Sequence, residues 1–309
     1  MPLTIDCGKA DAAIELAELV DTLQDRFDPR DEQGLAQWGP ALRSLANNRR
    51  FLGDLAIEEL KQHCSGQTAR NQYSAQVILL HSQRDFVIRA NLWPSESDSV
   101  YQNSGPAPFF YEMPHDHNFS FLTVGYLGPG YWSDYYEYEY ERVAGYPGEQ
   151  VDLRFMERSC LSPGKVLLYR KHRDVHSQLP PESLSVSLNI LAATPANEFQ
   201  DQYSFDLASS RVASVVNPSA LETLVRLAAV FGGGNGQDLV EDFAERHPSD
   251  RIRFAAWRAK AAAAPGVDGR IAVFEEAAER LGGLAAALAK REAAQIRAGR
   301  TWIEQGLAA

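Results

Sequence analysis

Two histidines, His115 and His117, have the residue type and spacing that most directly suggest chemistry, and a third, His176, follows farther along the chain. Side chains at positions i and i+2 of a β-strand point to the same face, so an extended segment would place the first two imidazoles side by side. Neutral imidazole is a common ligand of transition metals. A later strand that returns to this place would add His176. The sequence therefore predicts a metal site, and the alternative is a strand with solvent-exposed histidines.

The composition argues against several classes of function. The chain has 309 residues and a net charge of −11, with 41 acidic against 30 basic residues. Non-specific binding to nucleic acid or to anionic membranes needs a basic surface, so neither is expected. Residues 1–20 lack the basic start and continuous apolar core of a secretory signal, and no run of about 18 apolar residues occurs elsewhere. We therefore expect a soluble, cytoplasmic protein.

The cysteines restrict the chemistry of any metal site. Cys7, Cys64 and Cys160 are too few and too widely spaced for a disulfide framework or a paired-cysteine zinc site. A bound metal must therefore be held through nitrogen and oxygen.

The middle of the chain has the pattern of an all-β region. Short runs rich in apolar and aromatic residues are separated by glycine and proline turns, which indicates a sandwich or a small barrel. The expected strands cover residues 74–80, 86–93, 119–127, 135–142, 151–157, 165–170 and 184–191. Turn residues separate them throughout.

Helical patterns lie on both sides of the expected strands. Apolar residues recur at helical spacing within the first 64 residues, and an alanine-rich helical region begins near Asn217, where Ser219 and Glu222 fit a capping box. We expect an N-terminal helical segment at 1–70, a β-barrel with the metal site at 71–212, and an α-helical domain at 213–309. Paired helices in the last part fit either a short HEAT-like array or a plain helical cap on the barrel.

The histidine region resembles the cupin superfamily over roughly 74–192. The first cupin motif contains a glycine, a pair of histidines two residues apart, a glutamate and another glycine. The second cupin motif contains a glycine, a proline-x-glycine turn, a third histidine and an asparagine. The residues that match are Gly105, His115, His117 and either Gly125 or Gly128 in the first motif, and Gly164 and His176 in the second. This resemblance implies an α+β chain whose core is a double-stranded β-helix, or jelly-roll barrel.

The sequence departs from the cupin pattern in an informative way. Phe121 and Leu122 stand where the glutamate ligand would be, Arg170 and His172 replace the proline-x-glycine turn, and the asparagine is missing. Cupins that lack the glutamate and bind iron through three histidines include the thiol dioxygenases of the cysteine dioxygenase type, to which the order of elements here is similar. The chain has no cysteine just after His117 for the cysteine–tyrosine crosslink of some members.

The resemblance implies Fe(II) bound by His115, His117 and His176. A facial set of three ligands leaves three positions open on an octahedral ferrous ion, enough for a chelating substrate and dioxygen. We therefore expect a non-haem iron oxygenase, specifically a dioxygenase, that acts on a small polar or anionic molecule. Further candidates for the catalytic site are Tyr111, Tyr131, His172 and Arg170, while Asp116 or Asp174 could orient the ligand rings.

Several alternatives stay open at the level of sequence. Glu137, Glu139 or Glu141 could be a displaced fourth ligand or could form the solvated face of an edge strand. His172 could be a surface loop residue, an alternative third ligand or a proton-relay group near the metal. Arg89 and Arg170 could hold a substrate carboxylate or could point to solvent. The same site could use Zn, Mn or Ni in a hydrolase or isomerase, or the barrel could be a non-catalytic sensor or assembly module. The family resemblance also suggests a homodimer.

Overall fold

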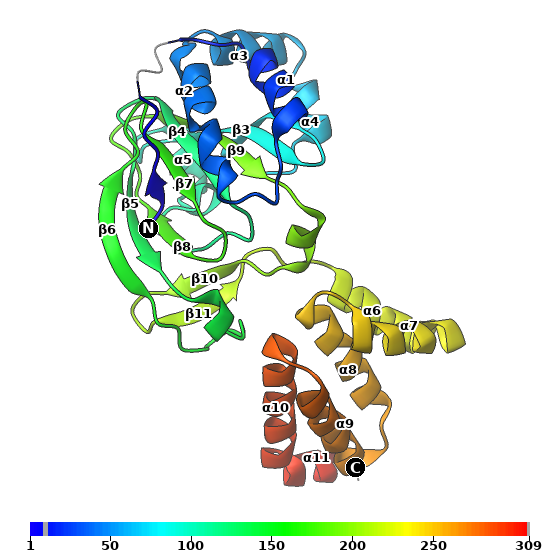
Figure 1. Cartoon of the computed structure of the whole chain (residues 1–309). Helices are drawn as coiled ribbons and strands as arrows, with labels where there is room; N and C mark the ends of the chain where they lie inside the picture. The colour runs from blue at the N-terminus through cyan, green and yellow to red at the C-terminus, as the bar shows by residue number, and fades with distance from the viewer. Residues whose placement is uncertain (9–11, 308–309) are drawn as a thin grey trace. The chain divides into compact units, whose positions relative to one another are not determined.

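The structure is a computed structural model that describes residues 1–8 and 12–307, and the chain divides into two compact units (Figure 1). Unit 1 consists of Met1–Glu139, Asp152–Glu198 and Gln202–Ser210. Unit 2 consists of Tyr140–Val151, Phe199–Asp201 and Arg211–Ala309. The helical segment expected at 1–70 therefore shares a unit with the sheets.

Unit 1 contains two antiparallel sheets that position the histidines. The larger has the order β1-β7-β4-β9-β3-β2 and consists of β1 (Leu3–Thr4), β2 (Val77–Ser82), β3 (Phe86–Trp93), β4 (Phe121–Leu127), β7 (Val166–Tyr169) and β9 (Ser185–Ala192). The smaller has the order β6-β5-β8 and consists of β5 (Trp132–Glu137), β6 (Arg154–Cys160) and β8 (Asp174–Gln178). The expected mixture of helices and antiparallel sheets is confirmed, and the closed jelly-roll barrel remains a prediction.

The two faces of the larger sheet have different partners because side chains alternate along each strand. One face, which includes Ile88, Leu122 and Ile190, packs with Leu19 and Leu42 of the N-terminal helices in one apolar core. The opposite face has a second, aromatic core that it shares with the smaller sheet; its buried members are Trp93, Phe109, Tyr111, Phe121, Tyr131, Tyr135, Leu161, Leu167, Tyr169 and Leu191. Side chains of both sheets therefore meet at the face that carries the histidine site.

Unit 1 also contains several short helices. They are α1 (Leu16–Arg26), η1 (Gly34–Trp38), α2 (Gly39–Asn47), α3 (Phe51–Lys61), α4 (Ser65–Arg70), α5 (Ser99–Ser104) and η2 (Ala107–Phe109), where η marks a 3₁₀ helix. The 3₁₀ helix η4 (Pro195–Phe199) follows β9, and β10 (Tyr203–Asp206) is the last strand of the unit.

Unit 2 is built mainly from helices, and many of its buried core residues are alanines. It contains η3 (Tyr140–Arg142), β11 (Arg211–Val215), α6 (Leu221–Phe231), α7 (Gly233–Arg246), α8 (Asp250–Ala263), α9 (Gly266–Arg280), α10 (Gly283–Ala298) and α11 (Arg300–Leu307). Its core packs Trp257, which is fully buried, among alanines such as Ala244 and Ala277. The Trp257 indole nitrogen donates to the Ala244 carbonyl oxygen at 3.1 Å. The HEAT-like arrangement remains a prediction.

Two expectations about strands are wrong. The strand expected at 135–142 ends at Glu137, and a 3₁₀ turn follows at Tyr140–Arg142. His115 and His117 do not lie in a named strand: His115 forms isolated bridges to His176 and Ser204. The segment around His115 is extended enough to form backbone bridges. These bridges go to two different strands and do not form a continuous ladder with either.

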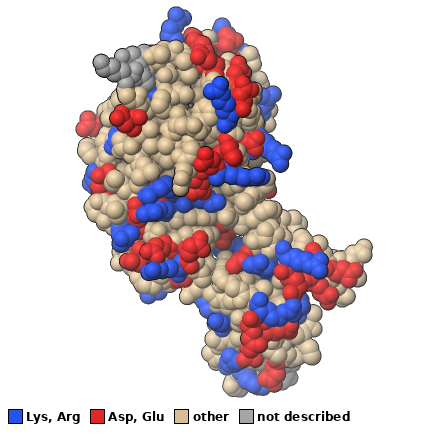
Figure 2. Space-filling model, in the orientation of Figure 1, with Lys and Arg blue, Asp and Glu red and all other residues tan. Residues whose placement is uncertain are grey.

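On the face shown in Figure 2, acidic and basic side chains are interspersed. Within residues 1–8 and 12–307, no helix has the length and apolar character required to cross a membrane.

Candidate metal centre

Backbone pairing brings the three histidines together. The His115 N–H donates to the His176 carbonyl, and the His176 N–H donates to the His115 carbonyl, each at 3.0 Å. His176 lies on β8 of the smaller sheet, while the His115–His117 segment directly precedes β4 of the larger one. The pairing therefore holds residues that are distant in sequence side by side at the junction of the two sheets.

The imidazole rings form a compact, buried group. Their potential ligand atoms all lie within 4.8 Å of one another. The Nε2 atoms of His117 and His176 are 2.9 Å apart, and the ring centroid of His115 lies 4.4 Å from that of His176. The three side chains are 4% (His115), 7% (His117) and 4% (His176) exposed. Among the described residues, this group contains no carboxylate and no fourth histidine.

Each ring has a polar partner at Nδ1, and the Gln178 amide nitrogen also lies 3.4 Å from Nε2 of His176. The His115 Nδ1 lies 2.7 Å from the Met113 carbonyl oxygen, which can only accept, so this nitrogen carries the proton. The side-chain amide nitrogen of Gln202 lies 3.2 Å from Nδ1 of His117, and that of Gln178 lies 2.5 Å from Nδ1 of His176.

The Gln178 amide indicates which nitrogen of His176 is available. Its oxygen is buried and has no hydrogen-bond partner within the described part of the chain, while its nitrogen faces Nδ1. Because amide oxygen and nitrogen are assigned from hydrogen bonding, exchanging them lets Nδ1–H donate to Oε1 and satisfies the orphaned acceptor. In this arrangement the Nε2 lone pair of His176 points toward His117.

Burial keeps the rings neutral. Desolvation lowers the pKa of His115 to about 4, partly offset by the hydrogen bond to Met113. Desolvation also lowers the pKa values of His117 and His176 well below the ordinary value, and the neighbouring His115 and Arg89 act in the same direction. At neutral pH each ring is therefore uncharged and keeps one nitrogen lone pair that it can offer to a cation.

The donor set fits a divalent transition metal. An octahedral ion with metal–nitrogen distances of about 2.1 Å places neighbouring ligand atoms about 3.0 Å apart, whereas tetrahedral angles separate them by about 3.4 Å. The 2.9 Å between the Nε2 atoms of His117 and His176 matches the octahedral case.

Aromatic and polar side chains line the space beside the histidines. The Tyr169 ring centroid lies 4.9 Å from that of His176, and the Tyr169 and Tyr135 hydroxyls are 2.9 Å apart. Burial raises the pKa of both tyrosines, that of Tyr135 to about 12, so both hydroxyls are protonated at neutral pH. Neither tyrosine was identified from the sequence as a site residue, because each reads as an ordinary core residue of its strand.

The two tyrosines expected near the site lie in the aromatic core that borders it. The Tyr111 hydroxyl donates to the Pro94 carbonyl oxygen at 2.8 Å, so the hydroxyl is bonded to the loop backbone. Tyr131 packs on Trp93 with ring centroids 4.0 Å apart, and burial raises its pKa well above the ordinary value. His172 donates its backbone N–H to the His117 carbonyl at 2.8 Å and has a positive φ of 55°, and its side chain is outside the three-histidine group.

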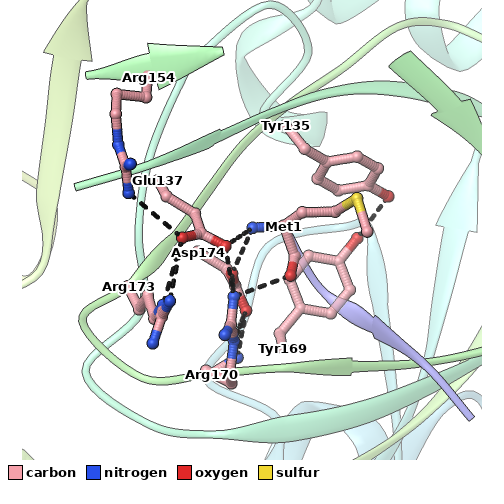
Figure 3. A network of polar contacts seen from close by, with 8 residues as sticks. All are labelled: Met1, Tyr135, Glu137, Arg154, Tyr169, Arg170, Arg173 and Asp174. Atoms are coloured by element: carbon pink, nitrogen blue, oxygen red, sulfur yellow. Dashed lines mark hydrogen bonds and ion pairs between the residues drawn. The ribbon is translucent and has the colours of Figure 1, made fainter. Parts of the chain in front are cut away.

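Arg170, the other expected catalytic residue, lies in an ion network (Figure 3). Its guanidinium donates to Asp174 at 2.6 Å and to Glu137 at 2.7 Å, and Arg154 and Arg173 also pair with Glu137. The Met1 ammonium pairs with both carboxylates, at 2.6 Å to Glu137 and 2.9 Å to Asp174.

The network accounts for the acidic candidates. Although burial raises the pKa of Glu137, the hydrogen bonds and charges of the Met1 ammonium and Arg170 outweigh it and lower the pKa to about 2. Glu137 is thus bound to cations and is not part of the three-histidine group, and the structure does not bring Glu139 or Glu141 to that group either. Asp174 belongs to the network, while Asp116 accepts from the Tyr138 hydroxyl and the Tyr203 N–H, each at 2.6 Å. Both Asp116 and Asp174 therefore stabilise the backbone around the site.

Comparisons with known proteins give no close relative. No family model matches the chain, and no curated protein matches it. Similar solved structures include a DMSP lyase, DddQ from Ruegeria pomeroyi DSS-3, with 10% identity over 36% of this chain and 40% of that chain and a TM-score of 0.22. Hydroquinone 1,2-dioxygenase PnpCD, in complex with Cd²⁺ and 4-hydroxybenzonitrile, has 10% identity over 42% of this chain and 71% of that chain, with a TM-score of 0.25.

A third match is the vicilin from Solanum melongena, with 10% identity over 56% of this chain and 43% of that chain and a TM-score of 0.22. The chain spans about two fifths of the length of the two DMSP lyase structures that it matches. TM-scores this low do not establish a common fold.

Proposed function

We propose that the chain is a three-histidine, Fe(II)-dependent oxygenase of the cupin type that acts on a small polar or anionic molecule. The observation that carries the proposal is the buried convergence of His115, His117 and His176, with 2.9 Å between two Nε2 atoms and polar partners at all three Nδ1 atoms. We further propose that the two sheets of unit 1 form a jelly-roll barrel around this centre, which their shared aromatic core supports.

A ferrous ion held by three neutral histidines would supply open positions for dioxygen and a chelating substrate, and would keep its full charge. The protein's own part is to exclude water and to fix the rings. The Met113 carbonyl and the amides of Gln178 and Gln202 hold the imidazoles, and the buried hydroxyls of Tyr135 and Tyr169 remain protonated beside His176.

The substrate class follows from a row of buried polar residues across three neighbouring strands. Arg89 of β3 is opposite Asn189 of β9, which is opposite Thr123 of β4. Within the described chain, Arg89 Nε, Asn189 Nδ2, Thr123 Oγ1 and the nearby Asn91 Oδ1 are buried without a hydrogen-bond partner. Such groups are costly to bury unless a ligand satisfies them.

Arg89 gives this row a positive charge. Its side chain is 9% exposed, its guanidinium carbon lies 5.0 Å from the centroid of the Tyr73 ring, and no described carboxylate forms an ion pair with it. Burial lowers the pKa of Arg89, and Tyr73 and Tyr131 partly offset the effect. A guanidinium stays charged in proteins, so a substrate carboxylate would supply the missing partner.

The proposal is tested by metal content and oxygen consumption. We expect the protein, reconstituted with Fe²⁺ without oxygen and then desalted, to retain iron, and His115→Ala and His176→Ala to lose it. His81→Ala, which changes a histidine of β2, is the matched control and should bind iron as the unaltered chain does. Undiminished iron in both site variants would contradict the metal centre.

Oxygen uptake separates oxygenase chemistry from its rivals. With a panel of small carboxylic acids, we expect the iron-loaded protein to consume oxygen in the presence of at least one member. Turnover of a panel member with Zn²⁺ or Mn²⁺ and without oxygen uptake would instead assign the site to Lewis-acid hydrolysis or isomerisation.

A further inference from the structure

A surface cavity of unit 1 lies against the segment that carries His117. Its volume is about 460 Å³, and it is lined on one side by residues 28–32 and on the other by Phe119, Ser120, Lys171 and Asn197. This volume lies within the range of about 300 to 1,000 Å³ that is usual for small-molecule sites. None of the three histidines lines the cavity itself.

Phe119 connects the cavity to the metal centre. Its half-buried ring lines the cavity, and the ring centroid lies 4.9 Å from that of His117 and 5.8 Å from that of Phe121. The Phe119 ring therefore both lines the cavity and contacts the ligand His117, which is 7% exposed.

The cavity wall and the ligand segment share one backbone framework. The His172 N–H donates to the His117 carbonyl at 2.8 Å, and the Lys171 N–H donates to the Ser120 hydroxyl at 3.0 Å. The Ala192 N–H also donates to the Ser120 carbonyl at 3.0 Å, so the main chain is bonded on both sides of Phe119. Rotation of the Phe119 side chain can therefore open a path while the backbone and His117 stay in place.

We propose that this cavity is the entrance through which metal ions and small molecules reach the three histidines, and that Phe119 is its gate. The inference rests on the proposed metal centre and adds its route of access. A competing route exists at Phe110, whose half-buried ring lies 5.6 Å from that of His115, on another ligand. Phe110 is therefore the matched control.

The experiment measures Co²⁺ binding to the metal-free protein by stopped-flow absorbance, and Co²⁺ release to excess EDTA. In Phe119→Ala we expect entry and release both to accelerate about tenfold, equivalent to about 1.4 kcal/mol in the barrier, which is the size of one aromatic contact. Because a gate affects both directions equally, the dissociation constant should stay the same. Phe110→Ala should leave both rates unchanged.

Several results would overturn the inference. Unchanged rates in Phe119→Ala, or acceleration in Phe110→Ala instead, would place the entrance elsewhere. Faster release alone, with weaker binding, would mean that Phe119 only supports His117. If Phe119→Ala fails to fold, Phe119→Leu tests the same expectation with a smaller change. Absence of Co²⁺ binding by the unaltered protein would instead contradict the metal centre itself, so the two failures are distinguishable.

Discussion

Gln178 provides the sharpest test of how the site is organised. Its amide lies 2.5 Å from Nδ1 of His176, two residues away on the same strand, and it is 2% exposed. If it orients His176 so that Nε2 faces the metal, Gln178→Leu should release the ring without removing any ligand. Gln178→Glu should retain the orientation, because a carboxylate can accept the same Nδ1 proton.

The expected magnitude follows from what the amide does. Loss of a hydrogen-bond partner behind a metal-bound histidine typically weakens metal binding about 10- to 100-fold, which corresponds to roughly 1.4 to 2.7 kcal/mol. Gln178→Leu should therefore bind Co²⁺ or Fe²⁺ more weakly by this factor. Gln178→Glu should bind at least as tightly as the unaltered chain, since the added negative charge makes the imidazole a better donor.

Competition with a chromophoric chelator gives the dissociation constants, and thermal unfolding in EDTA gives the stability without metal. Gln67→Leu is the matched control, because the Gln67 amide bonds the backbone of Leu79 and lies outside the histidine group. It should change stability but not metal affinity. Unchanged affinity in Gln178→Leu, or affinity lost equally in Gln178→Glu, would refute the assigned orientation.

Two further predictions concern charges. Arg89→Met should be at least as stable as the unaltered chain in thermal unfolding, because a buried group with an unsatisfied Nε is removed. The same substitution should abolish the spectral change that small carboxylates cause in the Co²⁺-loaded protein. Retained carboxylate binding would contradict the proposed substrate class. Glu137→Gln should destabilise unit 1 by about 3 kcal/mol at pH 7, because cations bound to this carboxylate lose their partner. The folded pKa of Glu137 is about 2, below the ordinary value of 4.5, so its contribution to stability is complete above pH 4.5 and declines as pH falls toward 2. Denaturant titrations of both chains should therefore converge over that interval, and a difference that persists at pH 2 would contradict this account.

The strands with apolar alternation were predictable from the sequence, and the strand that carries His176 was not. Residues 86–93 form β3 with the expected bounds, because apolar residues face the helical core at every second position. β8 (Asp174–Gln178) was missed because four of its five residues are polar, although all five are buried. The strand expected at 135–142 was placed too far along because its tyrosine–glutamate alternation continues beyond Glu137, where the chain turns.

For the site, residue type and spacing identified the right histidines as neighbours, although not for the expected reason. The period of two predicted that His115 and His117 would lie together, yet the chain there forms isolated bridges rather than a strand. The position of Gln202 beside His117 depends on contact between distant segments, which single-sequence patterns do not encode. Gln178 was missed because the strand that it shares with His176 was not predicted. Arg170 looked like a ligand for a substrate anion because its carboxylate partners, Glu137 and Asp174, are brought to it only by the fold.

The polar lining of unit 1 is itself an argument for a ligand. The same strands bury apolar side chains such as Ile88, Leu188 and Val124 on one face and the polar row of Arg89, Asn189 and Thr123 on the other. Each buried polar group without a partner costs about 1 to 3 kcal/mol, so folding alone would favour apolar residues in the row. Within this sheet, the row with these unpaired groups lies on the face that adjoins the three histidines. A molecule that bonds to these groups and binds the metal would recover this cost, and this predicts that a true substrate stabilises the folded protein more than the metal does by itself.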